Sequence, residues 1–502
     1  MYMKTRTKKF ILFFFILLLF KPVWLLNIDS IGDDELSYWL HSATLAFDYD
    51  IEYSNDYEVI ESWTFNNSNV PSHPPGSGYL SSLFIYFVDL FFEKEFDPNK
   101  NRLNPVGSFW ILGYLMSTLF YCCWGMYLLK STLSRISNNN KLINLVLIAT
   151  FLSSLSNYVL NRFMLSHSIE FFLVCAILYN LTKNKINLYF IVSLYFLLNL
   201  TRPTTFVISL LFLFVFSKNL KKNKLDFKFF TFLFSVVGSY LYIANRLYST
   251  YFIFTNSYRE NPVETLFKNE TVTDILFDIP SLFFSPSMGL LFISPIIFLS
   301  VLLIVANFKK DSIFKLLIIL GGVAIVLLWQ GKDVTFGQRF LIGQLPFAAI
   351  VILENSKKRK LISWYLYITI FISYLGNLYL YSSENLTLKP GTNLFGQYSN
   401  LSLQNYFINL PLELLNIEVT LSMFSRTIFF IILIKIFTLD NLLELLNPVF
   451  AFDINSERYQ TLKSYSDTYE AYEPSKFLFL ILLLLTFSYF TAGIFTKSKR
   501  NV

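Results

Sequence analysis

The run Val106-Gly-Ser-Phe-Trp-Ile-Leu-Gly-Tyr-Leu-Met-Ser-Thr-Leu-Phe-Tyr-Cys-Cys-Trp-Gly-Met-Tyr-Leu-Leu129 contains no charged residue. A helix rises about 1.5 Å per residue, so about 20 apolar residues cross the hydrocarbon core of a bilayer. The run is long enough for this. It predicts a transmembrane helix, and similar runs recur along the chain.

The composition of the whole chain agrees with that prediction. Of its 502 residues, 54% are hydrophobic, 19% are aromatic and 15% are charged, and the mean hydropathy is +0.49. Soluble domains average about 25% charged residues. The three cysteines lie in apolar runs, so neither a disulfide framework nor a zinc site is expected. The composition predicts an all-α polytopic membrane protein.

About 11–13 transmembrane helices are expected. The candidate spans are 10–26, 106–129, 142–160, 165–182, 186–201, 204–217, 229–247, 289–306, 316–329, 340–353, 361–381, 425–438 and 476–496. The first of them has a basic start, as a signal peptide has. Because bulky residues, Trp24 to Leu26, stand where a small-residue cleavage site belongs, we expect a retained anchor.

The placement of basic residues predicts the orientation. About half of the 41 Lys and Arg residues lie in the amino-terminal segment and in every second loop after it, the last of these at 357–360. Short loops rich in Lys and Arg stay in the cytoplasm. We therefore expect a cytoplasmic amino terminus in an integral, multi-pass cell (plasma or inner) membrane. The same bias explains the net charge of +7 without a nucleic-acid partner.

On this topology the first outer loop covers about 27–105 and contains the acidic cluster Asp33-Asp34-Glu35. Apolar residues follow it at helical spacing from Leu36 to Phe47, which predicts an amphipathic helix along the membrane surface. The two aspartates could simply cap that helix. Three consecutive acids against a membrane face nevertheless favour a functional site.

Other polar residues fall on the same outer side. His73 precedes Pro74-Pro75 and a second expected interfacial helix, and His167 lies in the segment Asn161-Arg162-Phe-Met-Leu-Ser-His167-Ser-Ile-Glu170. Arg202 and Arg339 stand at outer helix ends, where arginines often only extend toward water. Ionisable groups at such depth are costly and usually functional. Together they suit a substrate with an apolar tail and a phosphate head, because His and Arg bind phosphate through charge-assisted bonds.

In these motifs the chain resembles the GT-C glycosyltransferases that use polyprenyl-phosphate sugars, including the protein O-mannosyltransferases and the aminoarabinose transferases that modify lipid A. Asp34-Glu35-Leu-Ser-Tyr38 is similar to the Asp-Glu motif of their first outer loop, and His73-Pro74-Pro75 to a basic residue before Pro-Pro in the aminoarabinose transferases. The blocks Ser285–Pro295 and Trp329–Arg339 look like those of bacterial relatives. The likeness spans about residues 10–355.

The resemblance implies roles for individual residues. Asp34 would be the catalytic base, with Glu35 and Asp33 beside it. The donor phosphate would be bound by the basic residues His73, His167, Arg202, Arg339 and Lys332. Tyr38 and Gln338 would line the pocket. In mannosyltransferases an Asp stands near the position of His167, and the resemblance implies a role for that Asp in holding a cation. Since His167 replaces it, we expect no firmly bound Mg²⁺ or Mn²⁺ and at most weak dependence on either.

The expected function is that of an inverting glycosyltransferase that moves a sugar from a polyprenyl-phosphate donor to an envelope glycan, lipid or protein acceptor at the outer face. One alternative is a polymerase or ligase of lipid-linked polysaccharide, which should lack the acidic cluster after the first span. Another is a transporter or flippase, which should carry its ionisable residues near the middle of the membrane. We expect a catalytic domain at 1–381 with a GT-C-like fold, and a second region at 382–502 of unknown function.

Overall fold

The computed structural model describes residues 33–53, 70–92, 110–160, 162–221, 225–251, 253, 280, 282–284, 290–308, 312–328, 339–355 and 360–373, with scattered positions between 433 and 493. The chain divides into two compact units, residues 31–373 and residues 1–30 together with 374–502. Nearly all described residues belong to the first unit. The domain boundary expected at 381 lies outside the described residues and stays a prediction.

The described part of the chain is mostly helical and contains no strand. The first unit contains α2 (Asp33–Ala43), η2 (Thr44–Asp48), α4 (Gly76–Phe92), α6 (Trp110–Ile136), α7 (Asn140–Leu152), α8 (Ser154–Leu160), α9 (His167–Leu181), α10 (Leu188–Thr201), α11 (Pro203–Ser209), α12 (Leu211–Val215), α13 (Ser217–Leu220), α14 (Phe227–Tyr248), α18 (Leu290–Ile293), α19 (Pro295–Ala306), α20 (Ser312–Leu328), η5 (Arg339–Gln344) and α21 (Leu345–Glu354). A further helix covers Lys360–Ser373. The expected helical class is thereby confirmed.

The helices begin where the sequence satisfies their free N–H groups. The side chains of Asn139, Asn187 and Asp226 accept hydrogen bonds from backbone amides in the first turns of α7, α10 and α14. Such caps typically contribute about 1 kcal/mol each. Pro203 and Pro295 open α11 and α19, where a missing N–H has no consequence. Local chemistry therefore sets these boundaries.

Within the described ranges two helices, α6 and α14, are long and apolar enough to cross a membrane. The other apolar helices of the described part are shorter, and two expected spans contain interruptions. The segment 142–160 is split at Ser153, where serine side chains bond back to backbone carbonyls, and 204–217 is split into α11, α12 and the start of α13. Serine back-bonding of this kind competes with the regular helix ladder.

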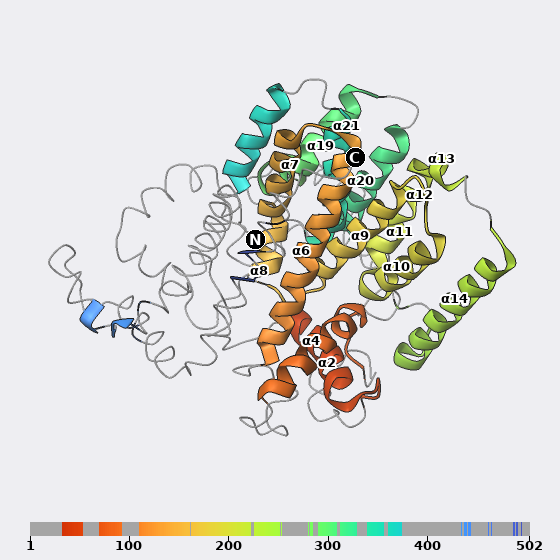
Figure 1. Ribbon diagram of the computed structural model, residues 1–502, viewed down its shortest axis with the longest axis vertical. Coiled ribbons are helices and arrows are strands. Elements are labelled where there is room, and N and C mark those ends of the chain that lie inside the picture. The colour runs from red at the N-terminus through yellow and green to blue at the C-terminus, as the bar shows by residue number, and fades with distance from the viewer. Residues whose placement is uncertain are drawn as a thin grey trace, which may run out of the picture. The chain divides into compact units, whose positions relative to one another are not determined.

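The first-loop helices lie together at one end of α6 (Figure 1). α4 packs on both α2 and α6, and α6 packs along α9. The prediction of a surface helix after Asp34 is also corrected, because the residues from Leu36 to Ala43 are buried on every face of α2. Gly78 lets α4 approach α2 this closely, because a side chain at that position would lie 2.8 Å from the backbone oxygen of Tyr38. α2 is thus packed inside the protein on all sides and does not lie on the membrane surface with one exposed face.

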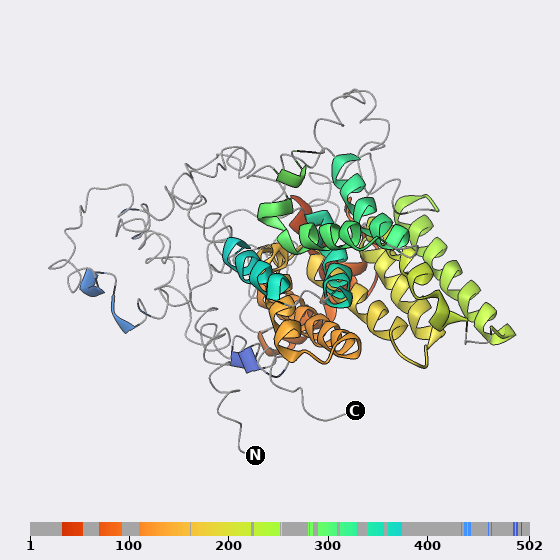
Figure 2. The ribbon, with the colours of Figure 1, turned by 90° about the horizontal axis from the view of Figure 1, so that it is seen from above.

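Apolar side chains also cover the outside of the first unit. α14 lies at its edge beside α10 (Figures 1 and 2) and leaves five large apolar side chains exposed, with Phe227 85% and Phe234 72% exposed. Exposed aromatic residues also follow one face of α6, at Phe120, Trp124 and Tyr127. Large exposed apolar patches of this kind mark a surface that contacts a membrane or another protein.

Candidate functional site

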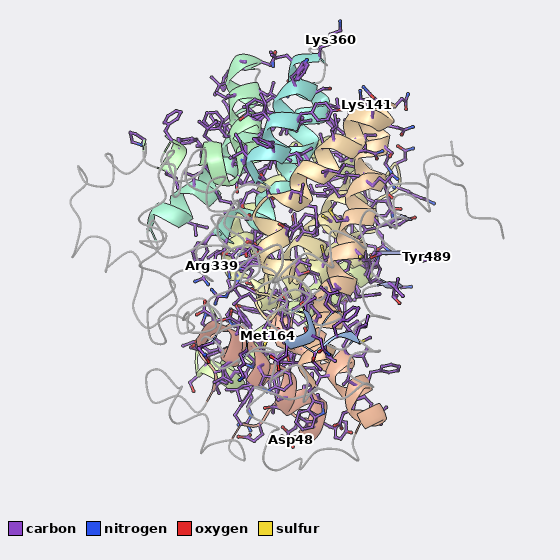
Figure 3. All side chains as sticks on the ribbon, turned by 90° about the vertical axis from the view of Figure 1, so that its left-hand side faces the viewer. Asp48, Lys141, Met164, Arg339, Lys360 and Tyr489 are labelled. Atoms are coloured by element: carbon purple, nitrogen blue, oxygen red, sulfur yellow. The ribbon has the colours of Figure 1, made fainter. Side chains whose placement is uncertain are left out.

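Charged side chains from six separate segments meet between the first-loop helices and the rest of the helices. They come from the start of α2, the loop before α4, the loop before α9, the first turn of α9, the α10–α11 junction and the start of η5. Figure 3 shows Arg339 and Met164 between Asp48 at one end and Lys141 and Lys360 at the other. The candidate site thus lies away from the basic loops.

Asp34 is the most accessible acid of the site, with 28% of its side chain exposed. Its Oδ2 accepts a hydrogen bond of 2.6 Å from Arg339 Nη1, and its Oδ1 lies 3.4 Å from His73 Nε2. Burial opposes ionisation of this carboxyl, but the neighbouring positive charge of Arg339 outweighs it and holds the pKa of Asp34 well below its usual range. Asp34 is therefore a carboxylate at neutral pH, held by a cation.

His73 is fixed through its backbone. Its N–H donates to Ser37 Oγ at 3.0 Å, and its carbonyl accepts from His41 Nε2 at 2.7 Å and from Tyr248 Oη at 2.8 Å. Burial lowers the pKa of its imidazole, although Asp34 acts in the opposite direction. The glycine at the start of α4 is also required, because a side chain at Gly76 would lie 2.6 Å from the backbone of Thr201. The Pro-Pro-Gly sequence therefore lets the loop with His73 pack against α10.

The buried His41 gives a prediction for stability. Burial lowers its pKa to about 3 from the ordinary 6.5. The unfolded chain therefore binds one more proton than the folded chain between these pH values, and the free energy of unfolding falls as pH is lowered from 6.5 toward 3, by up to about 1.4 kcal/mol per pH unit. Thermal unfolding midpoints across that window should show a shallower decline for His41→Gln, whose amide N–H can keep the hydrogen bond to the His73 carbonyl. An unchanged slope would contradict this role of His41.

Glu35 forms a second ion pair, with Arg162. Tyr38 lies next to this pair on α2, where its hydroxyl accepts a 3.2 Å hydrogen bond from Ser166 Oγ and its ring lies 5.1 Å from that of His73. α2 thereby presents Asp34 and Glu35 toward two different arginines. The helix links the loop before α4 with the loop before α9.

Glu170 forms the third acidic contact and is completely buried. It lies 3.0 Å from His167 Nδ1 and 3.7 Å from Arg202 Nε. The guanidinium groups of Arg202 and Arg339 lie 4.9 and 5.3 Å from the ring centre of Phe340, which links the inner and outer parts of the site. Each of these three carboxylates thus faces its own arginine. An anionic ligand would therefore compete with these carboxylates for the arginines, whose charges the carboxylates already neutralise.

Seven of the ten site residues predicted from the sequence are brought together here: Asp34, Glu35, Tyr38, His73, His167, Arg202 and Arg339. The side chain of Asp33 and the residues Lys332 and Gln338 lie outside the described part of the chain. The roles of all ten stay predictions. Arg162 and Glu170 were recognised as part of the segment that contains His167, but the sequence assigned no role to either.

No group of three or more His, Cys, Asp or Glu residues within the described ranges is arranged to hold a metal ion. The basic residues of the site are instead interleaved with its acids. Metal dependence stays a matter for experiment.

No protein-family profile, curated protein or solved structure matches this chain.

Proposed function

We propose that the chain is an integral membrane glycosyltransferase that moves a sugar, with inversion, from a polyprenyl-phosphate donor to an acceptor at the outer face of the membrane. The observation that carries this proposal is the meeting of Asp34 with Arg339 and His73 at one edge of an apolar helical body. A carboxylate that can take up a proton once Arg339 is drawn away lies there beside an arginine suited to a phosphate. The motifs that resemble the GT-C glycosyltransferases contain the same residues.

The exposed apolar faces of α6 and α14 support the membrane part of the proposal, because lipid chains would cover Phe120, Trp124, Phe227 and Phe234. The shorter apolar helices pack between and beside them. Basic residues such as Lys141 and Lys360 lie at the end away from Asp48 (Figure 3), as a cytoplasmic end requires. We propose an outer position for the end with the first-loop helices.

The chemistry follows from the charges. Asp34 accepts the proton of an acceptor hydroxyl as its oxygen attacks the anomeric carbon of the sugar. The bond between that carbon and the phosphate oxygen breaks, and the bonding electrons stay on the phosphate. Its added negative charge is stabilised by Arg339 and Arg202, whose effect is large in a site with little water.

The pairing of Asp34 with Arg339 also suggests an order of events. Arg339 Nη1 donates a hydrogen bond of 2.6 Å to Asp34 Oδ2, and this pairing makes the carboxylate a poor base. A donor phosphate offers Arg339 a second anionic partner. Asp34 then becomes available to the acceptor, so donor binding precedes productive acceptor binding.

A panel of polyprenyl-phosphate sugars tests the function directly. Membranes that contain the protein are incubated with each donor, and envelope glycans, lipids and proteins are analysed by mass spectrometry. One donor should give a mass increase of one sugar residue that depends on the protein. Polymer growth by repeat units would instead favour a polymerase, and the absence of any transfer across the panel would contradict the proposal.

A further inference from the structure

Glu170 is the most deeply buried charged group of the site, with no exposed side-chain area. It lies in the first turn of α9, where an acid is favoured by the helix dipole. Its side chain, however, is engaged by residues from other segments. A buried carboxylate is stable only if such partners compensate for the lost water.

His167 is the first of these partners. Its Nδ1 lies 3.0 Å from Glu170 Oε2, and because an ionised carboxylate only accepts hydrogen bonds, Nδ1 has the proton. Its Nε2 is buried and has no hydrogen-bond partner among the described residues. An unpaired buried polar atom indicates a position where a ligand or water atom completes the bonding.

The other partners come from the α10–α11 junction and from η5. Arg202 Nε lies 3.7 Å from Glu170 Oε2, while the Thr205 hydroxyl donates to Oε1 and the Gly343 N–H donates to the carboxylate. A side chain at Gly343 would lie 2.7 Å from Oε1, so only glycine lets η5 approach this closely. η5 begins with Arg339. One carboxylate therefore joins the three segments that contain His167, Arg202 and Arg339.

We infer that Glu170 is the positioning residue of the phosphate-binding arginines: it orients Arg202 and anchors η5, which begins with Arg339. It also fixes His167 with Nδ1 protonated, so that the unprotonated Nε2 is left as a hydrogen-bond acceptor for a ligand hydroxyl. This inference rests on the proposed function. The leaving phosphate gains negative charge as its bond to the sugar breaks, so fixed cations act mainly on the transition state. Loss of Glu170 should then lower kcat more than it raises the KM for the donor.

The tautomer of His167 can be observed without any assay of activity. The chain contains only three histidines, so ¹⁵N-histidine labelling of the purified protein in lipid nanodiscs gives few signals, and single variants assign them. The wild type should show His167 protonated at Nδ1. Glu170→Gln should shift the proton to Nε2, because the Thr205 hydroxyl keeps the amide oxygen at the Oε1 position and the amide NH2 then donates to Nδ1. Glu354→Gln, which alters an acid paired with Lys315 on another helix, should change nothing.

Kinetics provide the second measurement. Per folded molecule, Glu170→Gln should lower kcat by about 10²-fold and change the donor KM by less than about threefold, whereas Glu354→Gln should keep wild-type values. An unchanged kcat, or His167 protonated at Nε2 in the wild type, would overturn the inference. If Glu170→Gln does not fold, the wild-type tautomer still decides it. Absence of transfer by the wild type would refute the proposed function instead.

Discussion

Replacing Asp34 by Asn is expected to reduce sugar transfer by roughly 10²–10⁴-fold, the usual effect of losing a general base. The amide can still accept a hydrogen bond from Arg339, so the geometry at 2.6 Å needs little change. What disappears is the charge that takes up the acceptor proton. Transfer should be measured with purified protein at saturating donor, after size-exclusion chromatography has shown normal folding.

Glu52→Gln is the matched control for this variant. Glu52 belongs to the same loop and also pairs with an arginine, Arg246, but the pair is largely exposed. Its loss should leave transfer within about twofold, because exposed ion pairs contribute little to stability. Near-normal turnover in folded Asp34→Asn protein would remove the assignment of the base.

Replacing Arg339 by Gln should lower kcat by about 10²–10³-fold, comparable to losing one fixed donor to a developing negative charge. Arg339 both holds Asp34 before the donor binds and stabilises the leaving phosphate afterwards. Because the two residues act as a unit, the kcat of the double variant Asp34→Asn, Arg339→Gln should be nearly the same as that of the less active single variant. Initial rates of the wild type, the two single variants and the double variant give the coupling free energy between Asp34 and Arg339.

Arg246→Gln provides the control for a lost arginine. Arg246 lies in the last turn of α14, and its ion pair with Glu52 is largely exposed. It should keep normal rates. Multiplicative losses in the double variant, or a rate of Arg339→Gln close to that of Arg246→Gln, would show that Arg339 and Asp34 act independently.

The sequence predicts most of the helices but not their interruptions. Uncharged runs such as 106–129 have a clear physical meaning, and α6 and α14 cover the corresponding segments. The break at Ser153 depends on hydroxyls that bond to the backbone instead of pointing outward. The burial of α2 depends on α4, whose approach cannot be deduced from the periodicity of α2 alone.

The residues of the site were partly predictable from the sequence, but their partners were not. Residue types, their outer-side placement and the resemblance suffice to select Asp34, His73, His167 and Arg339. The partner of each residue is a tertiary property: Asp34 and Arg339 are 305 positions apart. Arg162 and Glu170 have meaning only as partners of Glu35 and of the buried cations, and no local pattern reveals that.

The central claim is that this charged cluster binds the phosphate of a membrane lipid. Native mass spectrometry of the purified protein with polyprenyl phosphate, and with polyprenol of the same length, tests it without knowledge of the sugar. The wild type should bind the phosphate form at least about tenfold more tightly than the alcohol, and the double variant Arg202→Gln, Arg339→Gln should lose that preference. Equal binding of both lipids by the wild type, or an unchanged preference in the variant, would contradict the account.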